Sequence, residues 1–151
     1  MKIGVLSDTH GLLREEVIDA LSGCDVILHG GDINKQAVLD RLEEIAPVKV
    51  VRGNNDKEWA EHLPASLSIS LDDLQIYMTH KKKDLPEDLS AYDLVIVGHS
   101  HKYEEKQIGT CLLLNPGSCG PRRFDQAITL ALIETSGKVF TIRRIDIPHQ
   151  K

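Results

Sequence analysis

Aromatic side chains are scarce in this chain, since Phe, Trp and Tyr together make up 4% of its residues. The core must therefore consist mainly of Val, Ile and Leu. No apolar run approaches the roughly 20 residues that a membrane-spanning helix needs. Cysteine is also rare, with Cys24, Cys111 and Cys119 neither closely paired nor spaced as metal ligands. This odd count favours a reducing compartment over a disulfide scaffold.

An excess of basic residues is likewise missing, because the formal net charge is −5 at pH 7. This charge argues against a general nucleic-acid-binding surface. A phosphodiester or nucleotide-like substrate stays possible, because bound cations can reverse the local field. The apolar run at residues 1–6 is too short for a signal peptide and is followed at once by Asp8 and His10. We therefore expect a cytoplasmic protein with no membrane contact.

The length of 151 residues and the lack of repeats or linkers predict a single domain over residues 1–151. The first half predicts an alternation of strands and helices, with strands at 2–6, 25–29 and 48–52 and helices at 14–21 and 35–45. The second half predicts mainly strands, at 67–69, 75–79, 94–97, 111–114, 128–133 and 139–147. The sum is an α/β domain with two packed sheets and helices outside.

Polar side chains that suit catalysis or metal binding gather where predicted strands end. They are Asp8, His10, Asp32, Asn54, Asp56, His80, His99 and His101. In open α/β sheets, sites form beyond the carboxyl ends of the strands. Five separate segments could therefore deliver these groups to one rim.

Carboxylate, amide oxygen and neutral imidazole are usual ligands of divalent first-row metal ions. Each segment alone is commonplace, since Asp and Asn also favour turns. Two histidines directly after a buried strand, His99 and His101, are a stronger signal. The full set exceeds the four ligands of a simple zinc site, so it predicts a centre with two metal ions.

The order of these segments resembles the calcineurin-like metallophosphoesterase superfamily, and specifically its small single-domain prokaryotic phosphodiesterase branch. The motifs are Asp8-Thr9-His10, Gly31-Asp32, Gly53-Asn54-Asn55-Asp56, His80 and Gly98-His99-Ser100-His101, with Asn115-Pro116-Gly117-Ser118 and Pro121-Arg122 as further markers. The resemblance spans residues 1 to about 122. It implies a four-layer α-β-β-α sandwich of two mixed sheets and hydrolysis of phosphodiester bonds.

The resemblance also implies a ligand assignment. Asp8, His10 and His101 would hold one metal ion, Asn54, His80 and His99 would hold the other, and Asp32 would bridge them. A hydroxide between the two ions would attack phosphorus in line with the leaving oxygen. Manganese is the expected metal, with nickel, zinc, iron and cobalt as alternatives.

Three residues are expected to act beside the metals: Asp32 as the bridge, Asp56 as an orienting group, and Asn55. Many members of the superfamily have His where Asn55 stands, and some small members have Cys. Asn55 can donate a hydrogen bond to a leaving group but cannot protonate it near neutral pH. A second departure follows His80, where the lysine run 81–83 replaces the frequent His-Gly-His. This run is either a solvated face or a contact for an anionic substrate.

Two other functions compete with the enzyme. A retromer subunit resembles the same family and serves mainly as an interaction scaffold, so this chain could be a binding module with a residual metal site. A flavodoxin-like or nucleotide-binding domain would leave the strand-end histidines unexplained, and the chain lacks a Gly-x-Gly-x-x-Gly loop. His29, His62 and His149 are expected to lie outside the site. The sequence does not indicate an oligomeric state.

Overall fold

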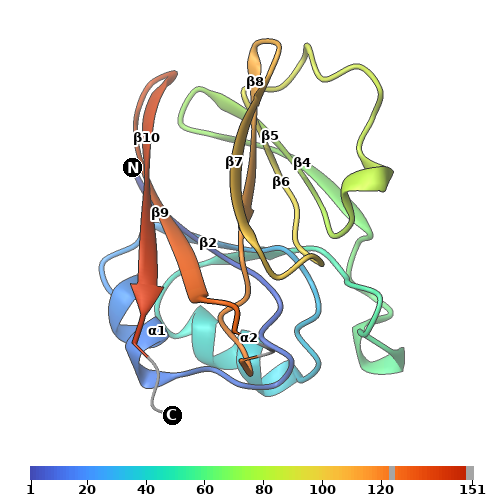
Figure 1. Ribbon diagram of the computed structural model, residues 1–151, viewed down its shortest axis with the longest axis vertical. Helices are drawn as coiled ribbons and strands as arrows, with labels where there is room; N and C mark the ends of the chain where they lie inside the picture. Colours follow the sequence, from blue (N-terminus) through green and yellow to red (C-terminus); the bar gives the residue numbers. More distant parts are fainter. Residues whose placement is uncertain (123–124, 149–151) are drawn as a thin grey trace.

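A computed structural model describes residues 1–122 and 125–148 and contains two five-stranded mixed sheets (Figure 1). The first sheet has the order β10-β9-β1-β2-β3. Its strands are Val139–Ile147, Ile128–Ser136, Lys2–Leu6, Val26–His29 and Val48–Val50, in that order. Strands β1, β2 and β3 are parallel, whereas β9 and β10 are antiparallel to their neighbours. The predicted parallel β-α-β-α-β opening is confirmed.

The second sheet has the order β4-β5-β6-β8-β7. Its strands are Ser66–Leu71, Leu74–Thr79, Leu94–Ile96, Cys111–Pro116 and Tyr103–Ile108, in that order. Strands β5, β6 and β8 are parallel, and the two edge strands run antiparallel to them. Strand β7 was not predicted, because its sequence Tyr-Glu-Glu-Lys-Gln-Ile is almost wholly polar and its side chains are partly or fully exposed.

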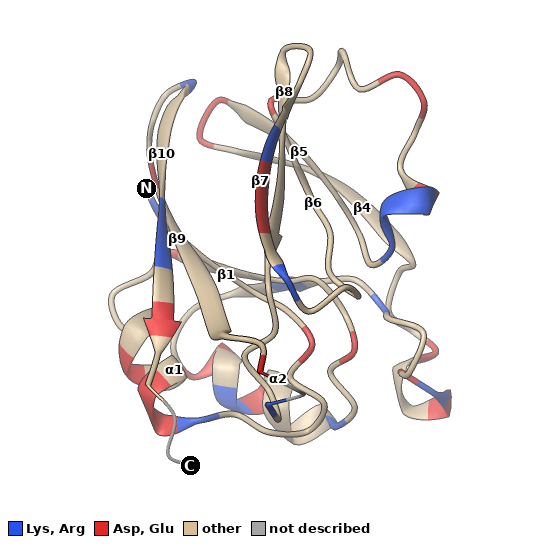
Figure 2. Ribbon diagram, viewed as in Figure 1, with Lys and Arg blue, Asp and Glu red and all other residues tan. Residues whose placement is uncertain are grey.

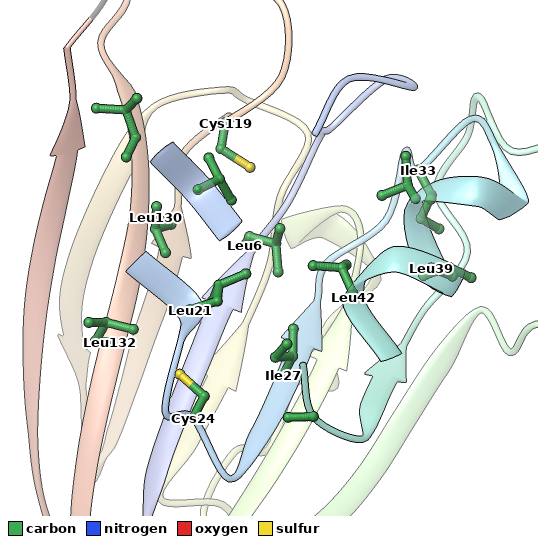
Figure 3. Close-up of a cluster of buried hydrophobic side chains, with 14 of the residues drawn as sticks. Leu6, Leu21, Cys24, Ile27, Ile33, Leu39, Leu42, Cys119, Leu130 and Leu132 are labelled. Atoms are coloured by element: carbon green, nitrogen blue, oxygen red, sulfur yellow. The ribbon is translucent and has the colours of Figure 1, made fainter. Parts of the chain in front are cut away.

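Apolar side chains alternate along the strands and so build a separate core on each face of the first sheet. Helices α1 (Glu15–Leu21) and α2 (Gln36–Glu43) cover its outer face. There Leu21 and Leu42 pack with Leu6 and Ile27 of the strands (Figure 3). Side chains on the other face of the first sheet, such as Val5 and Leu28, pack with Ile76 and Ile96 of the second sheet and form the core between the two sheets.

A third apolar cluster lies on the outer face of the second sheet, where Val95 and Leu113 pack against Leu85, Leu89 and Tyr92. The covering segment contains the short 3-10 helix η2 (Lys82–Asp84) and no α-helix. The sandwich of two mixed sheets is thus confirmed, and its fourth layer is largely irregular. A further 3-10 helix, η1 (Glu58–Ala60), follows β3. Within the described ranges, no helix is long and apolar enough to cross a membrane.

Candidate metal centre

Hydrogen bonds between loops bring the predicted site segments together. The backbone N–H groups of Asp8 and His10 donate to the carbonyl oxygens of Gly31 and Asp32, each at 2.9 Å. These contacts join the loops after β1 and β2. The backbone N–H of His99 donates to Asp8 Oδ2 at 3.1 Å and so links the loop after β6, in the second sheet, to the first sheet. The site therefore lies where loops of the two sheets meet.

Six of the seven candidate ligands form two adjoining groups. Asp8, His10 and His101 make one group, and Asp32, His80 and His99 make the other. Within each group, one ligand atom from every residue lies within 4.8 Å of the others. Carboxylate oxygen with imidazole nitrogen is a donor set that suits divalent first-row metal ions.

The two carboxylates lie between the groups. Asp32 Oδ2 is 3.1 Å from His80 Nε2 and 3.8 Å from His10 Nε2, so it approaches one imidazole of each group. Asp8 Oδ1 is 3.4 Å from His101 Nε2 and 3.8 Å from the Nε2 atoms of both His10 and His80. The carboxylate oxygens and imidazole nitrogens of the two groups thus converge on one small volume.

Two buried atoms at the centre are available to bind a cation. Asp8 Oδ2 accepts hydrogen bonds from Ser7 Oγ at 2.7 Å and from the His99 N–H, whereas Asp8 Oδ1 accepts none from the residues that the structure describes. His80 Nδ1 lies 2.8 Å from the carbonyl oxygen of Gly30, to which it donates. Within the described residues, His80 Nε2 makes no hydrogen bond of suitable geometry, although it lies 3.1 Å from Asp32 Oδ2. Buried polar atoms are normally satisfied. An orienting bond on one ring nitrogen with the other free is typical of a metal-binding histidine, so the residues fit a bound cation.

The pKa shifts of the carboxylates and of His80 are also consistent with a cation site. Burial alone would raise the pKa of Asp8, but the imidazoles of His10 and His101 outweigh it and hold that pKa far below its usual range. Burial also opposes ionisation of Asp32, yet His80 lowers its pKa. The reverse interaction raises the pKa of His80 against the effect of burial. A divalent cation would therefore compete with a proton for His80.

Most of these candidate ligands have an uncommon backbone conformation. Asp8, His10, Asp32, His99 and His101 all have positive φ values, between 47° and 73°. For residues other than glycine this left-handed conformation is uncommon, and such strain clusters at functional sites. The hydrogen bonds between loops hold it in place.

The three residues after Gly53 take different positions. Asn54 is exposed and, with His80, lines a cavity beside the two groups. Asn55 donates its backbone N–H to Asp32 Oδ1 at 2.8 Å and its side-chain amide to Asp32 Oδ2 at 3.4 Å. Asp56 is buried and accepts hydrogen bonds from the loop that carries Asp32. A side chain at position 53 would collide with Asp32, so this close approach requires glycine.

The other histidines lie apart from both groups. His29 is fully buried; its Nδ1 accepts the Gly31 N–H at 3.1 Å, and its Nε2 lies 3.1 Å from Thr9 Oγ1. It therefore supports the loops that carry the candidate ligands. His62 is exposed, as expected. His149 falls outside the described residues.

Asn115 supports the site in a way that sequence reasoning did not foresee, although it belongs to a marker segment of the family. Its side-chain amide donates to the carbonyl oxygen of Gly98 at 3.1 Å and to Ser100 Oγ at 3.0 Å. Ser118 Oγ, from the same segment, donates to the carbonyl oxygen of Asp8 at 3.1 Å. These bonds brace the loops that hold the candidate ligands from both sheets.

Fold and donor set together define a candidate centre for divalent metal ions at the meeting of two mixed sheets. The model of the calcineurin-like phosphoesterase superfamily domain matches residues 1–138. A probable metallophosphoesterase of Methanothermobacter thermautotrophicus is 32% identical over 150 residues, covering 89% of this chain and 87% of that protein. The chain therefore belongs to the calcineurin-like phosphoesterase superfamily.

Further relatives include phosphodiesterases. The phosphodiesterase YfcE of Escherichia coli K12 is 31% identical over 145 residues, covering 78% of this chain and 79% of that protein. The solved structure of a novel archaeal phosphodiesterase matches with a TM-score of 0.77 at 26% identity, covering 97% of this chain and all of the other. Vps29 of Chaetomium thermophilum has the same fold, with a TM-score of 0.79 at 20% identity and 97% coverage of both chains.

Proposed function

We propose that this protein hydrolyses phosphodiester bonds at a centre of two divalent metal ions, with manganese as the expected metal. The observation that carries the proposal is the position of Asp32, whose Oδ2 approaches an imidazole from each ligand group. We infer that Asp8, His10 and His101 hold one ion and that His80, His99 and Asn54 hold the other. Asp32 contributes to both.

Two bound ions would supply an activated water molecule as nucleophile and neutralise charge on the phosphoryl oxygens. The chain's own residues prepare the site for this role. Ser7 and the backbone of His99 orient the Asp8 carboxylate, and the Gly30 carbonyl fixes the ring of His80. Both carboxylates stay ionised at neutral pH, because the imidazoles around them lower their pKa values.

The leaving group receives little help from the protein. Asn55 is exposed at the edge of the site and can donate only a neutral hydrogen bond. Asp56 does not face the substrate in this proposal; it positions the Asp32 loop through backbone N–H groups. A substrate with a good leaving group should therefore be favoured.

The proposal is tested by removing metal with a chelator, adding Mn²⁺, and counting bound ions by elemental analysis. Hydrolysis of bis(p-nitrophenyl) phosphate is compared with that of p-nitrophenyl phosphate. We expect about two ions for each chain, no turnover without metal, and faster hydrolysis of the diester. Two bound ions without hydrolysis of either compound would instead support the scaffold function.

A further inference from the structure

A cavity of about 380 Å³ opens directly beside the candidate metal centre. His80 and Asn54 line it, and both are candidate ligands of one metal ion. The remaining wall comes mainly from the loop around Arg52 and Gly53, from β5, and from Lys81, Lys83 and Asp84 in and beside η2. A substrate bound at the metals could therefore extend into this space without leaving the protein surface. The volume lies within the range of small-molecule sites.

The cavity is basic, although the whole chain carries a net charge of −5. Arg52, Lys81 and Lys83 line it, and Asp84 is the single acidic residue among the lining residues. Within residues 1–122 and 125–148, none of these three cations forms an ion pair. The side chain of Arg52 donates to the neutral carbonyl oxygen of Glu61, at 3.4 Å, and to no other group in the same ranges. Positive charge is therefore free to act on a bound ligand.

The lysine run divides between the cavity and the outer surface. Lys81 and Lys83 face the cavity, whereas Lys82 Nζ forms an ion pair with Glu104 Oε1 at 2.8 Å and does not line it. Figure 2 shows the η2 turn largely in blue, apart from both helices. A run that was only a solvated face would not direct two of its three members to one cavity.

We propose that this cavity binds a second phosphate group, so that the preferred substrate is a nucleotide-like phosphodiester with a further phosphate on one ester arm. This inference rests on the proposed function and specifies its substrate class. Arg52, Lys81 and Lys83 attract the additional phosphate, while the diester itself occupies the metal centre. Tyr77, also in the lining, offers a partly exposed ring against which a sugar can pack.

The kinetic test uses two substrates that differ by one phosphate. They are thymidine 5′-(p-nitrophenyl phosphate) and the same compound with a 3′-phosphate, and release of p-nitrophenolate is followed for both. We expect KM for the 3′-phosphorylated compound to be about 5–20-fold lower, since a partly exposed charge pair contributes up to about fivefold. In Lys81→Ala/Lys83→Ala this ratio should fall to about 1–2. Lys82→Ala is the matched control and should keep the wild-type ratio.

A binding measurement separates this inference from the proposed function. Thymidine 3′,5′-bisphosphate is titrated calorimetrically into metal-free protein, with thermal unfolding as a check that each variant is folded. The Lys81→Ala/Lys83→Ala protein should bind it about 5–20-fold more weakly than wild type or Lys82→Ala. If wild type hydrolyses neither substrate, the proposed function fails and the binding result alone decides the inference. Equal KM values for the two substrates, or equal affinities for all three proteins, would overturn it.

Discussion

The carboxylate of Asp56 accepts the backbone N–H of Asp32 at 3.0 Å, and this bond ties the loop after β3 to the loop after β2. The same Oδ2 atom accepts the N–H of Gly53 at 2.8 Å. The other oxygen, Oδ1, accepts the N–H groups of Ile33 at 2.9 Å and Asn34 at 2.8 Å. One buried side chain thus satisfies four backbone donors and sets the position of Asp32.

Replacing Asp56 should destabilise the metal-free protein. Asp56→Ala leaves four backbone N–H groups without their acceptor, and buried donors without partners are costly. We expect a loss of about 2–4 kcal/mol in the free energy of unfolding, and a smaller loss for Asp56→Asn, which keeps one acceptor oxygen. Urea unfolding in the presence of chelator measures both. Asp19→Ala, an exposed change on α1, is the control; a loss at position 56 no larger than at position 19 would contradict the role of Asp56.

The sequence predicted the fold and the rim of the site because both depend on regular patterns. Apolar runs predicted nine of the strands and both α-helices, and polar residues at the strand ends marked the candidate ligands. The hydrogen bonds of Asp56 and Asn115 could not be predicted from the sequence, since they depend on how separate loops pack. The different orientations of Lys81, Lys82 and Lys83 could not be predicted either, because Lys82 differs from the other two by its ion pair with Glu104, which lies far away in the sequence. Strand β7 was missed since an exposed edge strand needs no apolar alternation.

Replacing Asp32 should remove metal and activity together. Asp32→Asn keeps the shape of the side chain but removes the negative charge near both ligand groups, so under the proposed assignment each ion would lose a charged ligand. We expect fewer than two ions for each chain after dialysis against Mn²⁺. Turnover of bis(p-nitrophenyl) phosphate should fall by at least about 10²–10³-fold. Elemental analysis and initial rates are measured beside Asp19→Asn; an Asp32→Asn protein with two ions and full activity would refute the assignment.

His29 should make the stability of the metal-free protein depend on pH. Burial lowers the pKa of His29 to about 4, against about 6.5 for an unfolded chain. Between these values the unfolded state binds more protons, so the contribution of His29 to stability is lost as the pH falls from 6.5 toward 4. The loss between pH 7 and pH 5 amounts to about 2 kcal/mol.

The His29→Gln variant isolates this contribution, because Gln does not titrate and the other ionisable groups are retained. Urea unfolding with chelator at pH 7 and pH 5 should show that the variant loses about 2 kcal/mol less than wild type over this interval. The comparison is independent of any lower stability that the variant has at both pH values. Identical losses in the two proteins would show that His29 is not held neutral by burial.

Asn55 should make the rate depend steeply on the leaving group. Departure of an alkoxide needs a proton, and general acid catalysis typically contributes about 10²–10⁴-fold. Asn55 cannot provide that proton, and its amide already donates to Asp32 Oδ2 at 3.4 Å. Aryl phosphodiesters should therefore be hydrolysed far faster than alkyl ones.

Asn55→His introduces an imidazole at an exposed position beside Asp32, where it can protonate a leaving oxygen. It should raise kcat/KM most for the diesters with the poorest leaving groups and so flatten the plot of log kcat/KM against leaving-group pKa. Asn55→Ala is the matched control: it keeps the backbone N–H bond to Asp32 but supplies no acid, so its plot should run parallel to that of wild type. The measurement is kcat/KM for the three proteins over diesters with graded leaving groups. Parallel plots for all three would mean that position 55 shapes only the turn after Gly53.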